Sequence, residues 1–256
     1  TLSGADFIAA EDTRVTVKLL NHLGIKKPMV PYHRHNCQDM GGVVADRLLA
    51  GESCALVTDA GTPAISDPGE ELVKLCADNG VEVVAIPGPC ALVTALSVSG
   101  LPTGRFTFEG FLPMNKKNRK AHLRSLTGEQ RTMIFYEAPH KLSATLADLR
   151  DTFGGDRRIS LCRELTKLHE EVRRTTLDEA VAWYQANSPK GEFVLVVEGA
   201  QPAEAESVSP EDGLALVERY RAEGLSLRDA ARRAAEETGL PRKELYDRAL
   251  GKNGKE

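Results

Sequence analysis

The fold of this chain is indicated best by residues 57–69, which read Val57-Thr58-Asp59-Ala60-Gly61-Thr62-Pro63-Ala64-Ile65-Ser66-Asp67-Pro68-Gly69. They follow an apolar run, residues 54–57, that has the length and composition of a buried strand. In open α/β sheets, ligands bind just beyond the carboxyl ends of the strands. Glycine and proline fix an unusual backbone path here and polar side chains line it. This stretch therefore predicts a ligand-binding turn.

A second turn of the same kind follows along the chain. Residues 69–78 predict a helix and residues 81–86 an apolar strand. Then come Pro87-Gly88-Pro89-Cys90-Ala91 and a helix of small residues, 92–99. Right-handed crossovers make the two predicted strands parallel. Two turns rich in glycine and proline suggest one nucleotide-like ligand, although most turns of this composition only connect secondary-structure elements and bind nothing.

The composition is that of an ordinary globular protein. Of the 256 residues, 41% are hydrophobic and 27% charged, which suits one large or two modest domains. The formal net charge of −4 argues against a generally basic surface for nucleic acid, but not against local basic patches. There is no bilayer-length apolar run and no secretory signal pattern, and the five cysteines form no metal-binding pattern. We therefore expect a cytoplasmic protein with no membrane segment and no metal site.

The pattern of elements predicts three parts. Residues 1–103 predict an α/β domain with a parallel sheet, and residues 104–200 a second α/β domain with a mixed sheet. Residues 201–256 predict a polar linker and a tail that resembles a helix-turn-helix, with Ser209 and Ser226 as N-caps. The elements expected in the last two parts are strands at 106–111, 132–136, 159–162 and 193–197 and helices at 140–153, 177–185, 210–222, 227–237 and 242–250.

Six longer motifs occur in one order along the chain. They are Ala-Glu-Asp-Thr-Arg (10–14), Asp-Ala-Gly-Thr-Pro-Ala-Ile-Ser-Asp-Pro-Gly (59–69), Pro-Gly-Pro-Cys-Ala (87–91), Phe-Glu-Gly-Phe-Leu-Pro (108–113), Phe-Tyr-Glu-Ala-Pro-His (135–140) and Arg-Glu-Leu-Thr-Lys (163–167). From about residue 3 to about residue 250, the chain resembles the bacterial ribosomal RNA small-subunit methyltransferase I family of the tetrapyrrole-methylase superfamily. The resemblance implies a two-domain tetrapyrrole-methylase-like α/β fold with a small C-terminal helical domain. Family members begin with a strand and a Pro-Ile-Gly-Asn-Leu-like loop, which we expect to be missing from this sequence.

The resemblance also implies a reaction. It is the S-adenosylmethionine-dependent 2′-O-methylation of a cytidine ribose in the 16S ribosomal RNA of the small subunit, by a homodimer. One alternative keeps the fold and makes the protein a precorrin-type tetrapyrrole C-methyltransferase. Another makes it a non-catalytic regulator that binds nucleic acid through its tail. The basic run near residue 116 and the helical tail favour RNA, since a porphyrinoid enzyme needs neither.

The sequence has no dinucleotide fingerprint, so a cofactor is not held by a conventional Rossmann glycine loop. Carried over position by position, the resemblance implies eight residues for S-adenosylmethionine. They come from the first turn, the second turn and the C-terminal α/β unit: Asp59, Gly61, Thr62, Ile65, Cys90, Ala91, Tyr136 and Leu165.

Three polar clusters are candidates for catalysis, because a ribose hydroxyl needs a base close by and a cation near the developing charge. Asp12 and Arg14 lie in the first, Glu11-Asp12-Thr13-Arg14, whose alternative is an N-cap, at Asp12 or Thr13, for the following helix. His35 lies in the second, Tyr32-His33-Arg34-His35-Asn36, whose alternative is a solvated loop. Glu137 belongs to the third, where it and Lys141 are candidates to orient the substrate, and it is alternatively part of a salt-linked helix N-terminus. Asp12 or His35 is our candidate for the base.

The densest basic run is the candidate RNA contact. It contains Lys116, Lys117, Arg119 and Lys120 and follows the strand predicted at residues 106–111. Phosphate contact makes affinity fall steeply with salt. A single-stranded or looped RNA is expected, since a ribose hydroxyl must be presented to a cleft.

Overall fold

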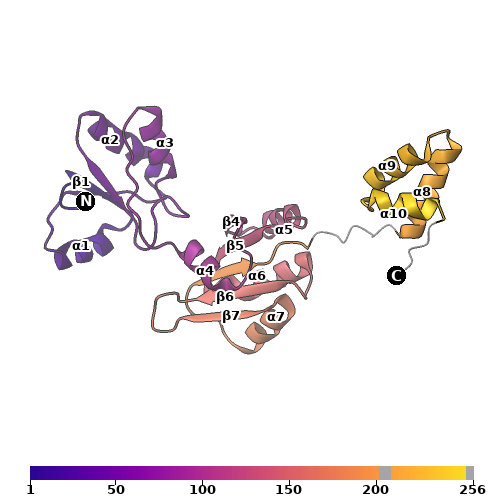
Figure 1. The fold of residues 1–256 in the computed structure, drawn as a ribbon. Helices are drawn as coiled ribbons and strands as arrows, with labels where there is room; N and C mark the ends of the chain where they lie inside the picture. The colour runs from indigo at the N-terminus through magenta and orange to yellow at the C-terminus, as the bar shows by residue number, and fades with distance from the viewer. Residues whose placement is uncertain (202–208, 252–256) are drawn as a thin grey trace. The chain divides into compact units, whose positions relative to one another are not determined.

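The computed structural model describes residues 1–201 and 209–251 (Figure 1). The chain forms two compact units, Thr1–Ala200 and Gln201–Glu256. Most of the predicted linker, residues 202–208, lies outside the described residues.

A small parallel sheet opens the first unit. Its strand order is β2-β1-β3, and all four residues of the central strand are buried. Alternate side chains of that strand face opposite layers: Phe7 and Ala9 pack with the helices that follow its neighbours, and Ile8 with Leu20 on the other face. The elements are β1 (Phe7–Ala10), α1 (Thr13–His22), β2 (Met29–Pro31), α2 (Cys37–Leu49), β3 (Cys54–Val57) and α3 (Glu70–Asp78).

The structure has no strand at residues 81–86, so the predicted parallel crossover to that segment is wrong. Residues 81–90 form neither helix nor strand, and the side chains of Val83, Val84 and Ile86 are 50%, 68% and 60% exposed. A strand needs a neighbour to satisfy its backbone polar groups, and among the described residues the small sheet ends at β3. A run of apolar residues was therefore insufficient to make a strand.

A mixed sheet forms the second part of this unit, as expected. Its order is β4-β5-β8-β6-β7, in which β4 and β5 are parallel and the other neighbours antiparallel. Its elements are α4 (Ala91–Ser99), β4 (Phe106–Phe111), α5 (Lys116–Ser125), β5 (Thr132–Glu137), α6 (Pro139–Phe153), β6 (Arg158–Arg163), β7 (Glu171–Thr176), α7 (Leu177–Ala186) and β8 (Phe193–Val197).

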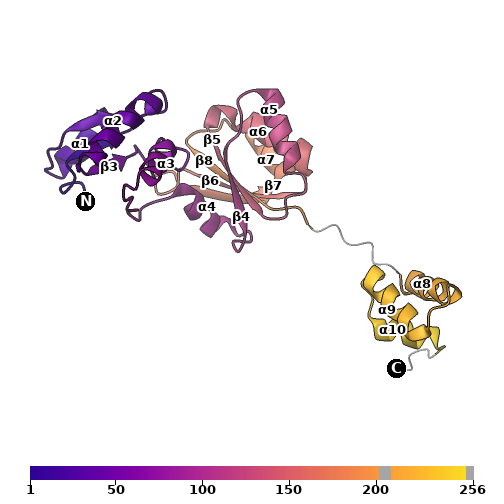
Figure 2. The same ribbon diagram turned by 90° about the horizontal axis from the view of Figure 1, so that it is seen from above.

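Helices cover both faces of the mixed sheet. Helices α5, α6 and α7 lie on one face and α4 on the other (Figure 2). Alternation along β5 explains this, because Met133 and Phe135 pack into the first layer and Ile134 into the second. The predicted domain boundary at residue 103 assigns α4 to the first domain, yet α4 packs on the second sheet. That boundary stays a prediction.

The second unit is a three-helix domain, α8 (Pro210–Ala222), α9 (Leu227–Thr238) and α10 (Arg242–Ala249). Both predicted caps are confirmed, since Ser209 accepts a 3.0 Å hydrogen bond from the backbone of Asp212 and Ser226 a 3.2 Å bond from Asp229. None of the helices in residues 1–201 and 209–251 is long and apolar enough to cross a bilayer. Within the same residues, no group of three or more His, Cys, Asp or Glu side chains is arranged to hold a metal ion.

Candidate functional site

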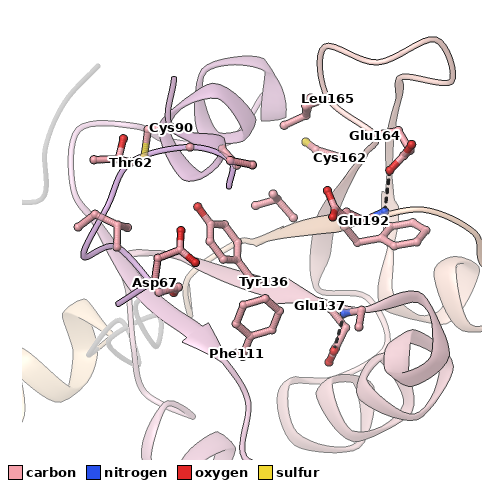
Figure 3. A pocket seen from close by; sticks show the side chains of 18 of the residues that line it. Thr62, Asp67, Cys90, Phe111, Tyr136, Glu137, Cys162, Glu164, Leu165 and Glu192 are labelled. Carbon is pink, nitrogen blue, oxygen red and sulfur yellow. Dashed lines mark hydrogen bonds between the residues drawn. The ribbon is translucent and has the colours of Figure 1, made fainter. Parts of the chain in front are cut away.

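A cavity of about 480 Å³ lies in the first unit (Figure 3). Its wall is made by the turn after β3, the start of α4, the end of β5 and the loop between β6 and β7. Segments far apart in the sequence therefore converge on one space. Its size is within the range that small-molecule and cofactor sites occupy.

The turn after β3 has a strained backbone. Ala64 and Ser66 adopt φ values of 67° and 64°, which side-chain-bearing residues rarely adopt. Gly69 ends the turn at φ 139°, and a Cβ atom there would lie 2.7 Å from Cδ2 of Leu56 in β3. The glycine is thus required both by conformation and by close packing. Strain of this kind persists where surrounding structure fixes it, which is common at binding sites.

Two hydrogen bonds join the turns around the cavity. The Thr62 hydroxyl donates to the carbonyl of Pro89 at 2.9 Å, so the first turn holds the second in the absence of a strand there. The backbone N–H of Leu92 donates to the Tyr136 hydroxyl at 3.1 Å. The Tyr136 ring packs edge-on against Phe111, with centroids 5.6 Å apart. Burial raises the pKa of Tyr136, so its hydroxyl is protonated at neutral pH.

The structure brings together most of the residues proposed for S-adenosylmethionine. Those that line the cavity are Gly61, Thr62, Ile65, Cys90, Ala91, Tyr136 and Leu165. Asp59 belongs to the same turn but is exposed and does not line it. Burial and the nearby carboxylates of Glu11 and Asp12 raise the pKa of Asp59.

The candidate bases Asp12 and His35 do not line the cavity. Asp12 caps α1, accepting from the backbone N–H of Arg14 at 2.8 Å, and pairs with the Arg14 guanidinium at 2.6 Å. Hydrogen bonds from Arg14 lower the pKa of Asp12 to about 2, which makes it a poor proton acceptor. The geometry supports the capping alternative for Asp12 and Arg14. His35 is exposed on a loop whose Arg34 donates to the carbonyl of Ser66.

Glu137 is one of the lining residues, but its carboxylate is bound at the start of α6. The carboxylate accepts a 2.8 Å hydrogen bond from the backbone N–H of Ala138 (Figure 3). It also accepts a 2.5 Å bond from the Thr145 hydroxyl. The side chain is 5% exposed. Its role is to fix the start of α6, so the geometry does not support a catalytic role.

Four charged residues of the wall were not among the sequence candidates. Asp67 lies in residues 57–69, the predicted ligand-binding turn, so its position in that turn was the signal that could have identified it. Lys167 bridges Glu164 at 3.0 Å and Glu192 at 2.8 Å across the cavity rim. Glu192 lies far in the sequence from the motif at residues 163–167, which contains Glu164 and Lys167, so only the folded structure brings Glu192 to the site.

The predicted RNA-contact residues lie on α5, outside the cavity. Lys116, Lys117 and Lys120 are exposed. Arg119 instead forms a 2.7 Å ion pair with Asp148 of α6, in which the two side chains are only 15% and 10% exposed. The guanidinium of Arg119 is therefore committed to packing α5 on α6.

Comparison with known proteins places the chain. Residues 1–181 match the family of tetrapyrrole (corrin/porphyrin) methylases, and residues 207–253 match the RsmI C-terminal HTH domain. The ribosomal RNA small subunit methyltransferase I of Synechocystis sp. is 49% identical over 98% of this chain and 90% of its own length. The protein of that name from Pseudomonas aeruginosa is 46% identical over 97% of this chain and 88% of its length.

The chain belongs to the ribosomal RNA small subunit methyltransferase I family. The family expected from the six motifs is thereby confirmed. Solved structures agree on the fold: the methyltransferase CobJ matches with a TM-score of 0.58, at 18% identity over 78% of this chain and 85% of that one. The uroporphyrin-III C-methyl transferase of Thermus thermophilus, complexed with S-adenyl homocysteine, matches with a TM-score of 0.52, at 16% identity over 76% and 86%.

Membership of the methyltransferase I family disfavours the tetrapyrrole alternative, since the likeness to the solved tetrapyrrole enzymes, at 16–18% identity, is one of fold alone. The cavity of this family member also fits S-adenosylmethionine chemically. Phe111, Tyr136 and Leu165 offer apolar surface, and Gly61 allows the backbone to approach a ligand closely. The aromatic rings of Phe111 and Tyr136 also suit the positive charge of a sulfonium.

Proposed function

We propose that this chain is an S-adenosylmethionine-dependent methyltransferase that methylates the 2′ hydroxyl of a cytidine in the 16S ribosomal RNA of the small subunit. The observation that carries the proposal is the convergence of Gly61, Thr62, Cys90, Ala91 and Tyr136 on one cavity. The family resemblance implies the same residues for the cofactor. The names of the curated relatives support the RNA substrate.

The residues of the cavity would bind and orient the reactants of this reaction. S-adenosylmethionine supplies a methyl group that is already activated on a positively charged sulfur, so the protein's task is alignment and removal of a proton. The aromatic wall of Tyr136 and Phe111 excludes water from the reacting atoms. The N-terminus of α4, where Ala91 lines the cavity, favours an anionic group of a ligand. Orientation of this kind can contribute roughly 7–11 kcal/mol to lowering the barrier.

The RNA would contact the protein outside the cavity. Lys116, Lys117 and Lys120 present three exposed positive charges on α5, close in sequence to the cavity residue Phe111. The helical unit of residues 209–251 is a second candidate contact. We propose a homodimer from the family resemblance alone, and a cytoplasmic location from the five scattered cysteines, which form no metal-binding pattern.

Calorimetric titration of the chain with S-adenosylmethionine and methyl transfer to 30S subunits test the proposal together. The variant Ala91→Trp puts a large ring into the cavity and should weaken S-adenosylmethionine binding at least tenfold. Val93→Trp is the matched control, because Val93 lies on the same helix, is 53% exposed and does not line the cavity. Its affinity should equal that of the wild type.

The position of the transferred methyl group decides the chemistry. A methylated 2′ oxygen cannot attack the neighbouring phosphate, so alkaline hydrolysis leaves one gap in the ladder of RNA fragments at the modified ribose. Methylation of a uroporphyrinoid instead of RNA would restore the tetrapyrrole alternative. Tight binding of duplex DNA with no affinity for S-adenosylmethionine would restore the regulator.

A further inference from the structure

The cavity wall contains one carboxylate that its neighbours do not engage in an ion pair or a helix cap. Of the four acidic side chains there, Glu137 is bound to the start of α6, and Glu164 and Glu192 are bound to Lys167. The fourth is Asp67, at the end of the strained turn after β3. Figure 3 shows Asp67 and Tyr136 pointing into the same space.

The surroundings of Asp67 are rich in other acidic groups. Glu11 lies beyond the end of β1 and accepts a 2.5 Å hydrogen bond from the Thr58 hydroxyl, and Asp59 lies in the same turn as Asp67. Arg34, from the loop after β2, is the nearby cation, but its guanidinium donates to the backbone carbonyl of Ser66. The side chain of Asp67 is half-buried.

These groups set the protonation of Asp67. Burial raises the pKa of its carboxyl, and the charges of Glu11 and Asp59 raise it further, while Thr58 and Arg34 partly oppose the rise. A carboxylate that holds its proton more tightly than usual is a better proton acceptor near neutral pH. Asp12, whose pKa is lowered, is by the same argument a weaker proton acceptor than Asp67.

We propose that Asp67 is the general base that takes the proton of the ribose hydroxyl during methyl transfer. The proposal rests on the function proposed above. The ribose oxygen forms a bond to the methyl carbon while its proton passes to a carboxylate oxygen of Asp67. The electrons of the broken carbon–sulfur bond stay on sulfur, which becomes a neutral thioether, and Asp67 then releases the proton to water. Tyr136, whose hydroxyl holds the start of α4, faces the same cavity and positions the reactants.

The test uses the full chain, 30S subunits and three variants. Asp67→Asn keeps the shape of the side chain and removes the base, whereas Asp67→Glu keeps a carboxylate. Glu70→Gln is the matched control, because Glu70 carries the same charge three residues along the chain, is exposed and does not line the cavity. For each protein, the kcat is measured across pH, the Kd for S-adenosylmethionine by calorimetry, and the melting temperature by circular dichroism.

Asp67→Asn should lower kcat by about 10²- to 10⁴-fold while the Kd for S-adenosylmethionine changes less than threefold. The acid limb of the wild-type pH profile should disappear in this variant. Asp67→Glu should recover part of the rate, and Glu70→Gln should match the wild type.

Stability gives a readout that does not depend on turnover. Because the pKa of Asp67 is raised in the folded state, the folded protein binds the proton more tightly than the unfolded chain does. The resulting stabilisation is complete below the unfolded value of 3.8 and is lost as the pH rises through the folded value. At pH 7, Asp67→Asn should therefore melt no lower than the wild type. An Asp67 held only for structure would give a lower melting temperature.

Three outcomes would overturn the assignment. If the Asp67→Asn variant keeps a near-normal kcat, another group takes the proton. A parallel loss of cofactor affinity and turnover would mean that Asp67 binds the cation of the donor and does not take the proton. Lower stability with unchanged pH dependence would make it a structural residue. Failure of the proposed function is distinct, because it appears as wild-type protein that does not methylate 30S subunits.

Discussion

The hydroxyl of Tyr136 accepts a 3.1 Å hydrogen bond from the backbone N–H of Leu92. Leu92 is the second residue of α4, so this N–H is one of the donors that a helix N-terminus leaves without an internal partner. Strand β5 thereby fixes the start of α4 at the cavity. One side chain thus serves as both a wall of the site and a support for its second turn.

Tyr136→Phe should separate these two roles. The ring and its contact with Phe111 remain, but the N–H of Leu92 loses its acceptor at a cost of about 1 kcal/mol. We expect S-adenosylmethionine to bind about five- to tenfold more weakly in calorimetry, because the start of α4 is no longer fixed. Tyr184→Phe is the control, since Tyr184 lies on α7 and does not line the cavity. Equal affinities for both variants would contradict the supporting role of Tyr136.

The turn after β3 should be intolerant of any side chain at Gly69. Gly69→Ala forces a Cβ atom against Leu56 in a backbone conformation that alanine rarely adopts, and should lower the free energy of unfolding by about 1–3 kcal/mol. Gly42→Ala is the opposite case. Gly42 lies inside α2 with open space around it, so alanine there should stabilise by about 0.5–1 kcal/mol. Urea denaturation, followed by the fluorescence of the single tryptophan, Trp183, measures the free energy of unfolding of both variants.

The sequence predicted the two turns well because their shape is local. The glycines and prolines of residues 57–69 act within a few residues of their own position, as the φ of Gly69 illustrates. The segment 81–86 failed for the opposite reason. Val83, Val84 and Ile86 have strand-like composition, but a strand also needs a partner, and partners are a property of the whole fold.

The catalytic candidates failed in a related way. A cluster such as Asp12-Thr13-Arg14 has the same sequence pattern whether its charged side chains bind a ligand or pair with each other. In the structure, Asp12 and Arg14 satisfy each other and cap α1. Asp67 has no charged residue next to it in the sequence, and its environment is assembled from Glu11 and Arg34 on two other loops and from Asp59 in its own turn. Such an environment has no short-range signal.

The exposed lysines of α5 should carry part of the RNA affinity. Replacing Lys116, Lys117 and Lys120 by Gln removes up to three phosphate contacts, each worth about 0.7 in the slope of log affinity against log salt for single strands. We expect binding of 30S subunits to weaken and its salt slope to become shallower by about 2. Affinity for S-adenosylmethionine should not change. A matched triple variant at the exposed Lys18, Lys26 and Lys74 should leave the slope unaltered.

Arg119 should behave differently from its lysine neighbours. Arg119→Ala leaves Asp148 charged and largely buried without its partner, which should cost about 3 kcal/mol of stability. The double variant Arg119→Met, Asp148→Leu replaces the pair with apolar side chains and should recover most of that loss. Urea denaturation checks this, and the salt slope of RNA binding should match the wild type in the double variant. A shallower slope there would return Arg119 to the RNA contact.

Cysteine labelling should report occupation of the cavity directly. Cys90 and Cys162 line it, but burial raises the pKa of Cys162, as it raises the pKa of Cys54 to about 11 and that of Cys76. The thiolate is the reactive form, so those three should react slowly with iodoacetamide at pH 7.5 and faster only as the pH approaches their raised values. Mass spectrometry of the peptides should show Cys90 labelled first and protected by S-adenosylmethionine.

Cys37 lies outside the cavity wall and is an internal control, since its labelling should be the same with and without the cofactor. Equal protection of both thiols would point to a general stabilisation of the fold, and no protection of Cys90 would place the cofactor elsewhere.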